Sequence, residues 1–167
     1  MKTYIAYFAK MDGVNSECKT DAENFFTENV PVFRCSDKEL ELIYYFRWWT
    51  FYKHIKRTPE GYVITEFLPD VPWAGKYNTI NLPAAIHIME ARWLRNSRYA
   101  EDSLRFWFQK GGALRSYTTW LEYATWQFSM TREAEKLIDE AVTHSLNVWL
   151  LLSQHPSCLR IPTSFST

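Results

Sequence analysis

Residues 36–55 read SDKELELIYYFRWWTFYKHI, and this stretch decides the fold class because it predicts one long, aromatic helix. The segment SDKE at 36–39 fits a capping box, in which the Ser36 hydroxyl accepts from an early helical N–H and the Glu39 side chain reaches back. Apolar residues recur at helical spacing after it, and the helix is apolar around most of its middle. We therefore expect it to pack against neighbours on more than one side. The predicted stripe is Leu40, Ile43, Tyr44, Trp48, Phe51, Tyr52 and Ile55.

Weaker patterns on both sides of this helix predict an all-α protein. A short helix at 22–28 precedes it and ends before Pro31. The segment TPEG at 58–61 predicts a turn, and YVIT at 62–65 a brief strand. Further helices are expected at about 83–95, at 97–109 with Asn96 or Ser97 as the cap, at 116–130, and from Thr131 to about residue 152. The expected core residues are Ile86, Met89 and Trp93 in the first of these four helices, and Ala100, Leu104, Trp107 and Phe108 in the second. In the third they are Tyr117, Trp120, Leu121, Ala124 and Phe128, and in the fourth Leu137, Ile138, Ala141, Ser145, Val148, Trp149 and Leu152.

Helices joined by short loops favour antiparallel helical hairpins. No fixed repeat length supports a tetratricopeptide array. We expect a lead-in at residues 1–35, a helical domain at 36–153 and an irregular tail at 154–167.

The overall composition excludes several classes of partner. The chain of 167 residues holds 19 Lys and Arg against 19 Asp and Glu, so its formal net charge of zero gives no indication of nucleic acid or of an anionic membrane. Three cysteines at 18, 35 and 158 match no metal spacing, and no cofactor motif is present. The start MKTYIAYFAKMDG lacks the apolar core of a secretory signal, and Val148–Leu152 is too short to span a bilayer. These features predict a soluble, cytoplasmic protein without metal or cofactor.

Aromatic residues make up 17% of the chain, with 8 Trp, 10 Tyr and 11 Phe. Most of them must belong to the core. Trp and Tyr also pair a flat apolar face with one polar atom, which suits stacking on a sugar ring or a base.

Two groups on the predicted helices carry charges among apolar neighbours. Arg47 lies within YYFRWWTF, and a guanidinium there either forms a structural ion pair, to Glu66 or Glu90, or contacts a ligand. His87 and Glu90 lie three residues apart, on the same side of one helix. They fit an acid/base pair or two metal ligands, but a core histidine bonded to a carboxylate is the favoured interpretation, since no third ligand follows at a recognisable spacing.

Two loops also offer polar groups. The segment GGALRSY at 111–117 places Arg115 and Tyr117 at a helix entrance, where exposed N–H groups favour an anion or a hydroxyl-rich ligand. Taken alone, a simple helix stop and restart is the favoured interpretation of this segment. The loop ITEFLPDVPWAGKYNTIN at 64–81 combines Glu66 and Asp70 with Trp73, Gly75 and Asn78. Two carboxylates beside an indole are what glycosidic bond cleavage requires, but loop carboxylates are more often solvated or cap helices.

Four blocks carry a resemblance to a known family: YYFRWWTFYKHI at 44–55, TEFLPDVPWAGKYNTIN at 65–81, EARWLRN at 90–96 and FWFQKGGALRSYTTW at 106–120. In this order and spacing they resemble the six-hairpin glycosidases, and more closely the mannosylglycerate hydrolase-like and processing-glucosidase-like members of the trehalase clan. The resemblance runs from about Glu41 to about Trp126 and fades after Thr131.

The resemblance implies an (α/α)6 barrel in which the loops at one end form a sugar-binding pocket. It implies inverting hydrolysis of an α-linked oligosaccharide or glycoside, with an aspartic acid as general acid and a glutamate as general base. The residues that would line or support the subsite are Phe46, Arg47, Trp48, Trp73, Gly75, Asn78, Arg115 and Tyr117, with Glu66, Asp70, His87 and Glu90 in supporting roles.

The sequence departs from the family pattern because neither catalytic motif is found, so we assign no catalytic residue. A complete barrel needs about twelve helices of ordinary length, and this chain accommodates fewer than half of them. We therefore expect the N-terminal part of such a domain, with a small saccharide as ligand and apolar helix faces that favour self-association. The alternatives are a non-catalytic helical module that binds carbohydrate or protein, and an inactive, truncated remnant.

Overall fold

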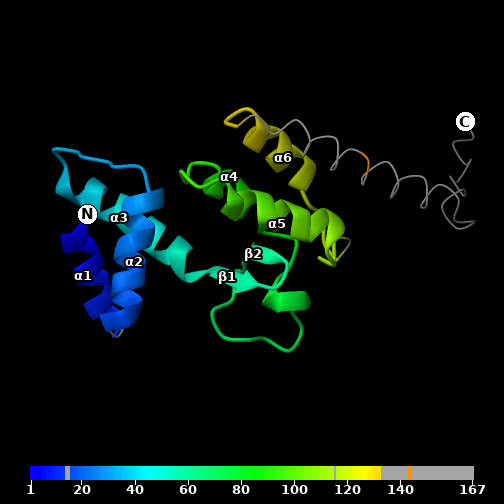
Figure 1. Cartoon of the computed structure of the whole chain (residues 1–167), viewed down its shortest axis with the longest axis horizontal. Coiled ribbons are helices and arrows are strands. Elements are labelled where there is room, and N and C mark those ends of the chain that lie inside the picture. Colours follow the sequence, from blue (N-terminus) through cyan, green and yellow to red (C-terminus); the bar gives the residue numbers. More distant parts are fainter. Residues whose placement is uncertain (14–15, 115, 133–142, 144–167) are drawn as a thin grey trace, which may run out of the picture.

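A computed structural model describes residues 1–13, 16–114, 116–132 and 143 of the chain. In Figure 1, helices α1, α2 and α3 gather on one side, and α4, α5 and α6 stack on the other, with a β-hairpin between the two groups. The prediction of an all-α fold of helical hairpins is confirmed, and the hairpin is a small addition to it. The elements are α1 (Lys2–Met11), α2 (Ser16–Asn29), α3 (Lys38–Lys53), β1 (Ile55–Thr58), β2 (Gly61–Ile64), the 3-10 turn η1 (Lys76–Asn78), α4 (Ala84–Ala91), α5 (Arg98–Gln109) and α6 (Leu121–Ser129).

The long aromatic helix α3 begins one residue later than the capping box predicts. Asp37, not Ser36, is the cap, and its carboxylate accepts from the N–H groups of Glu39 at 2.9 Å and Leu40 at 3.2 Å. The carboxylate that reaches back belongs to Glu41, which accepts from the Cys35 N–H at 3.3 Å. An aspartate satisfies two otherwise unpaired N–H groups and places negative charge at the positive end of the helix dipole.

The N-terminal residues are more ordered than a lead-in with one short helix. Two helices, α1 and α2, pack against α3 and against each other. Ile5, Phe8 and Ala9 recur on one face of α1, and each is at most 2% exposed. The buried face of α3 matches the predicted stripe in part, at Trp48 and Phe51. Tyr45, Trp48, Trp49 and Phe51 are buried, whereas Leu40 and Ile43 are about half exposed, at 48% and 55%.

Strands β1 and β2 form an antiparallel hairpin in which Ile55 pairs with Ile64 and Thr58 with Gly61. The predicted turn at 58–61 and the brief strand after it are confirmed, whereas Ile55, the last residue of the predicted helical stripe, lies in β1. Gly61 has a φ of +118°, and a Cβ built on it would lie 2.6 Å from the Asp102 carboxyl carbon. Glycine is therefore required there both by the backbone conformation and by the close approach of α5.

Helices α4, α5 and α6 follow the predicted order, and only α4 buries a face other than the predicted one. Ala84, Ala85, Ile88 and Ala91 of α4 are buried, whereas Ile86 and Trp93 are more than half exposed. Small side chains let α4 approach α6 and α5, with which it packs. The buried faces of α5 and α6 match the prediction, with Leu121, Ala124 and Phe128 buried in α6. Tyr117 and Trp120, which the prediction placed in the same helix, lie before α6 begins and are exposed.

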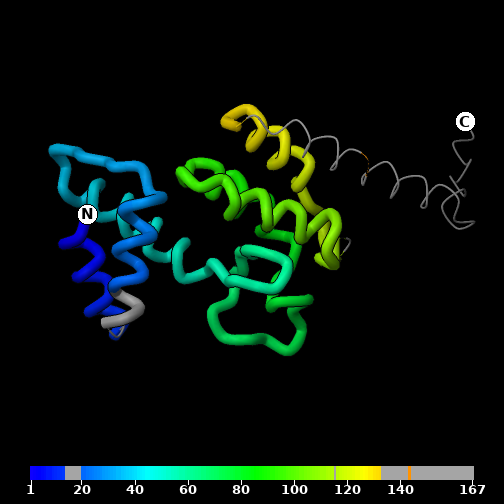
Figure 2. Tube along the Cα trace, in the orientation of Figure 1, coloured from blue at the N-terminus to red at the C-terminus, as the bar shows by residue number. Residues whose placement is uncertain are grey.

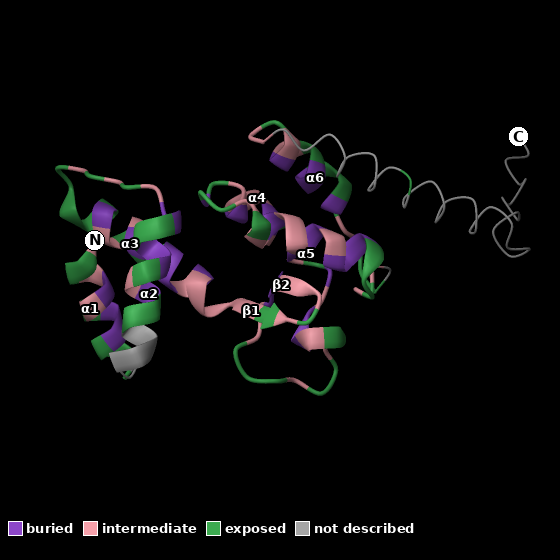
Figure 3. Ribbon diagram, viewed as in Figure 1, coloured by how far each residue is buried: buried purple, intermediate pink, exposed green. Residues whose placement is uncertain are grey.

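A long loop leaves β2 and returns to α4, and Figure 2 shows it as one wide excursion beneath the hairpin. Much of it is exposed, in contrast to the facing sides of the helices (Figure 3). Within the described part of the chain, no helix has the length and apolarity that crossing a membrane demands. The helix predicted after Thr131 and the tail at 154–167 lie outside the described residues. The predicted domain boundaries and the larger toroid stay predictions.

Candidate functional site

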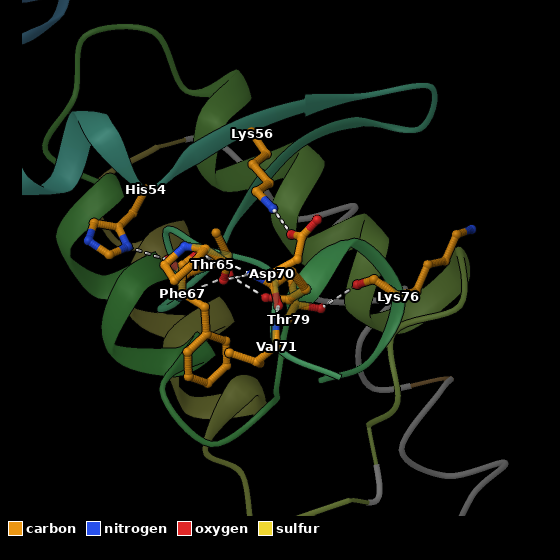
Figure 4. Close-up of polar contacts among 10 residues, drawn as sticks. His54, Lys56, Thr65, Phe67, Asp70, Val71, Lys76 and Thr79 are labelled. Atoms are coloured by element: carbon orange, nitrogen blue, oxygen red, sulfur yellow. Dashed lines mark hydrogen bonds and ion pairs between the residues drawn. The ribbon is translucent and has the colours of Figure 1, made fainter. Parts of the chain in front are cut away.

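The loop at 65–80 is held together by Thr65, at its start, which is labelled in Figure 4. Asn78, near the end of the loop, is its partner. The Thr65 hydroxyl donates to the carbonyl of Asn78 and accepts from the Phe67 N–H at 3.1 Å. The Thr65 carbonyl lies 2.8 Å from Nδ1 of His54, at the end of α3. The loop is therefore tied both to itself and to the helix that carries Arg47.

Asn78 is buried and organises the loop from inside. Its side-chain amide donates to the carbonyls of Phe67 at 3.1 Å and Pro69 at 2.9 Å, and its oxygen accepts from the Val71 N–H at 3.0 Å. Its φ is +61°, in the left-handed region that asparagine tolerates better than most residues. Both amide N–H donors of Asn78 are used within the loop, so a direct contact with a sugar, as predicted for Asn78, depends on the second lone pair of its buried oxygen.

Tyr77 also adopts the left-handed conformation, with a φ of +59°. A bulky residue stays there only when its surroundings hold it. The Tyr77 hydroxyl donates to Glu60 in the hairpin turn, and its ring contacts Phe106 of α5 with centroids 5.8 Å apart. Lys76 pairs with the same carboxylate at 2.8 Å, so the hairpin turn and α5 both fix the end of the loop.

Trp73 lies at the exposed part of the loop. Its side chain is 61% exposed, and its ring meets Phe67 edge to face with centroids 4.9 Å apart. Gly75 donates its N–H to the Thr79 carbonyl at 2.9 Å, and a Cβ there would lie only 3.0 Å from the same oxygen. The loop therefore exposes the Trp73 indole to solvent, and the bond between Gly75 and Thr79 fixes the backbone that follows it.

Arg47 of α3 and Glu90 of α4 form an ion pair that joins the two helices. This is one of the two partners that the sequence allowed for Arg47; Glu66 is not paired with it. The favoured bond between His87 and Glu90 is absent, because the Glu90 carboxylate accepts from Arg47 and Nδ1 of His87 has no hydrogen-bond partner in the described part. The guanidinium retains donors for a further partner, since its side chain is 56% exposed.

A cavity of about 140 Å³ lies beside this ion pair, between the end of α3, the hairpin and α4. We call it the α3–α4 pocket. Three predicted site residues from different parts of the chain converge on it: Arg47, Glu66 and His87. The full lining is Arg47, Phe51, His54, Ile64, Glu66 and His87.

Burial sets the charge of the groups in and beside this pocket. It lowers the pKa of His87 to about 4, with His54 and Arg47 adding to the effect. Burial also lowers the pKa of His54, although the hydrogen bond to the Thr65 carbonyl acts in the opposite direction. Burial raises the pKa of Glu66, and it raises that of Glu90 although Arg47 acts in the opposite direction. At neutral pH the pocket therefore holds neutral imidazole beside a guanidinium and carboxyl groups that ionise less readily than usual.

The remaining predicted residues lie elsewhere. Phe46 meets Phe8 of α1 edge to face at 5.4 Å, and Trp48 is 5% exposed among core rings. Asp70 is exposed and pairs with Lys56 at 3.1 Å, beside a separate cleft of about 490 Å³ between the hairpin and the loop. Tyr117 is exposed and its carbonyl accepts from Asn81 at 2.6 Å. Arg115 lies outside the described residues.

Sequence reasoning missed Phe51, His54 and Ile64 as lining residues of the pocket. Phe51 was assigned to the core stripe, and Ile64 to a strand. His54 had a usable signal, because a histidine between an aromatic helix and a strand lies where the chain changes direction. Among the described residues no group of three or more His, Cys, Asp or Glu side chains is arranged to hold a metal ion.

Comparison with known proteins identifies relatives of both sequence and fold. Residues 76–165 match the model of the mannosylglycerate hydrolase MGH1-like glycoside hydrolase domain. A solved structure titled "Sialidase" is similar to 90% of this chain, with 28% sequence identity and a TM-score of 0.79. The chain spans 15% of the length of that protein. No curated protein matches the sequence.

Proposed function

The chain belongs to the mannosylglycerate hydrolase MGH1-like glycoside hydrolase family, and on this premise we propose that it forms part of the saccharide-binding site of a glycosidase. Its substrate class is an α-linked oligosaccharide or glycoside, hydrolysed with inversion. The observation that supports this proposal most directly is the convergence of Arg47, Glu66 and His87 on the α3–α4 pocket.

The pocket offers the donors and acceptors that a sugar edge requires. A guanidinium donates hydrogen bonds only, a carboxylate accepts them, and a neutral imidazole can do both. Glu90 holds the guanidinium in place through the ion pair between α3 and α4. The guanidinium, the carboxylate and the imidazole together can donate to and accept from two adjacent hydroxyl groups of one sugar ring.

The size of the pocket limits what it can hold. Its volume of about 140 Å³ is less than the roughly 300–1,000 Å³ of a typical ligand site, so it admits the edge of one ring and leaves the ring face outside. Trp73 is the exposed indole on the loop that also carries Glu66. We propose that Trp73 is the stacking platform for that face.

Catalysis is assigned to none of the carboxylates of this chain. Inversion needs an acid and a base on opposite faces of one sugar ring. Glu66 lines the α3–α4 pocket whereas Asp70 lines the cleft beside the hairpin, so these two do not converge. The same observation favours the second candidate function, a helical module that binds carbohydrate without hydrolysing it.

Calorimetric titration with 4-nitrophenyl α-mannoside and α-glucoside, together with a turnover assay on both, tests the proposal. Loss of a stacking platform in Trp73→Ala should weaken binding about tenfold, which corresponds to roughly 1.4 kcal/mol. Trp126→Ala is the matched control, because that indole is also exposed, at 49%, and lies on α6. Equal affinity in the protein and in Trp73→Ala would refute the site. Binding of either glycoside without turnover would favour the second candidate function, a helical module that binds carbohydrate without hydrolysing it.

A further inference from the structure

A second cavity, of about 590 Å³, lies between α2, the end of α3, the hairpin and α5. None of the residues that line the α3–α4 pocket lines it. Its volume falls within the roughly 300–1,000 Å³ of sites that bind small molecules. The lining residues are Asp21, Phe25, Tyr52, Lys53, Ile55, Arg57, Tyr62 and Tyr99.

Four aromatic rings from four elements form a continuous row along this cavity. Phe25 of α2 contacts Tyr52 of α3 at 5.0 Å between centroids and Tyr99 of α5 at 5.5 Å. Tyr99 in turn contacts Tyr62 of β2 at 4.6 Å. We call these four side chains the aromatic row. Phe25 is buried at the centre of the row, and neighbouring rings are inclined to one another by 41° to 73°. The row therefore offers a ligand the half-buried rings of three tyrosines, each held by its neighbours.

The end of the row at Tyr62 carries a positive charge. Arg57 is the cross-strand partner of Tyr62 in the hairpin, so both side chains lie on the same face of the sheet. No carboxylate of the described residues lies within ion-pair distance of the exposed Arg57 guanidinium. The other cation of the lining, Lys53, is paired with Asp12 at 2.6 Å. Arg57 is therefore the cation available to a ligand.

We propose that this cavity binds an acidic monosaccharide, a hexuronate, whose ring lies on the aromatic row and whose carboxylate pairs with Arg57. Aromatic faces accept the C–H face of a pyranose ring, and a guanidinium binds a carboxylate through two parallel N–H bonds. Asp21 is the one carboxylate of the lining. It accepts hydrogen bonds from ring hydroxyls, which a plain aromatic acid lacks, so the polar lining favours a sugar over a flat aromatic anion.

The proposal is tested by titrating the protein with three probes: methyl β-glucuronide, methyl β-glucoside and benzoate. Glucuronide and glucoside share the ring and differ in the carboxylate, whereas benzoate has the carboxylate without the hydroxyls. We expect glucuronide to bind about tenfold more tightly than either of the others. Equal binding of glucuronide and glucoside, or of glucuronide and benzoate, would overturn the proposal.

Two matched variants locate the charge. Arg57→Gln should reduce glucuronide affinity to that of glucoside and leave glucoside binding unchanged. Lys56→Gln removes the same charge from the adjacent residue, whose side chain lies on the opposite face of β1, pairs with Asp70 at 3.1 Å and does not line this cavity, so it should keep glucuronide affinity. Equal losses in the two variants would refute the assignment, because they would indicate attraction by net charge alone.

The aromatic row needs its own variant. Tyr62→Leu should weaken glucuronide and glucoside by the same factor, because both rely on the ring face. Its circular dichroism spectrum should match that of the unchanged protein, since Tyr62 is half-buried in a hairpin that keeps its backbone pairing. Unchanged affinity of a folded Tyr62→Leu protein for both sugars would exclude the row as the platform.

Discussion

Asn78 holds the loop at 65–80 together through its side-chain amide, and its replacement gives a sharp test of the structure. It makes three hydrogen bonds to loop backbone, with Phe67, Pro69 and Val71, and it is 8% exposed. Asn78→Gly removes these bonds but keeps a residue that adopts positive φ freely. Asn78→Ala removes the bonds and also places a Cβ at a φ of +61°.

The expected cost follows from these two contributions. Three hydrogen bonds at about 1 kcal/mol each predict a loss of about 3 kcal/mol in the free energy of unfolding for Asn78→Gly. An alanine in the left-handed region costs about 1 kcal/mol more, so Asn78→Ala should lose about 4 kcal/mol. Both losses are a large share of the roughly 5–15 kcal/mol that a domain of ordinary stability possesses.

Urea denaturation followed by tryptophan fluorescence measures both changes. The midpoint should fall while the slope of the transition stays constant, which shows that stability has changed and the denatured state has not. Asn24→Ala is the matched control, because Asn24 is exposed on α2 and should change stability by less than about 0.5 kcal/mol. Losses of Asn78→Gly and Asn24→Ala that agree within error would refute the role of the Asn78 side chain.

Two further predictions concern the hairpin and the α3–α4 pocket. Gly61→Ala should lower the free energy of unfolding by about 2 kcal/mol, because the new Cβ meets Asp102 and φ is +118°. In the control Gly13→Ala the new Cβ meets no atom within 4 Å, so the loss should be about 1 kcal/mol. Equal losses of the two variants in urea denaturation would contradict the role of the contact with Asp102. In the folded protein the pKa of His87 is lowered to about 4, whereas in the unfolded chain it is about 6.5. Below pH 6.5 the unfolded chain therefore binds the proton more readily than the folded protein does. The free energy of unfolding should fall by about 3 kcal/mol as the pH drops from 6.5 towards 4. His87→Gln should flatten that pH dependence, and an unchanged slope between pH 6.5 and 4 would show that His87 is not its source.

Elements governed by local chemistry were predictable from the residues alone. The aromatic helix, the turn at 58–61 and the stop after Gln109 each depend on a few neighbouring residues. Lys110 and Gly112 both donate to the Phe106 carbonyl there, and Gly111 has a φ of +98°, as the two glycines suggested. The four sequence blocks that resemble the six-hairpin glycosidases also identified the family from the sequence alone.

Helix faces and most of the site geometry were not predictable in this way. In the helix predicted at about 83–95, the bulky residues Ile86 and Trp93 suggested the core side, but α4 ends at Ala91 and buries three alanines and Ile88 instead, because close approach of two helices favours small side chains. Similarly, α3 is apolar around its middle, so its own sequence cannot say which side α1 and α2 will cover. That choice depends on partners distant in the chain.

The same division applies to the site. The family resemblance indicated a sugar-binding loop that carries an indole, and residue types indicated a guanidinium that needs a carboxylate or a ligand. Only the tertiary structure decided that Glu90, not Glu66, pairs with Arg47, that Asp70 faces a different cleft, and that Asn78 supports the loop from inside. The physical reason is that hydrogen bonds and ion pairs depend on distances of a few ångströms, which the packing of α3, α4 and the hairpin sets and the spacing along the chain does not.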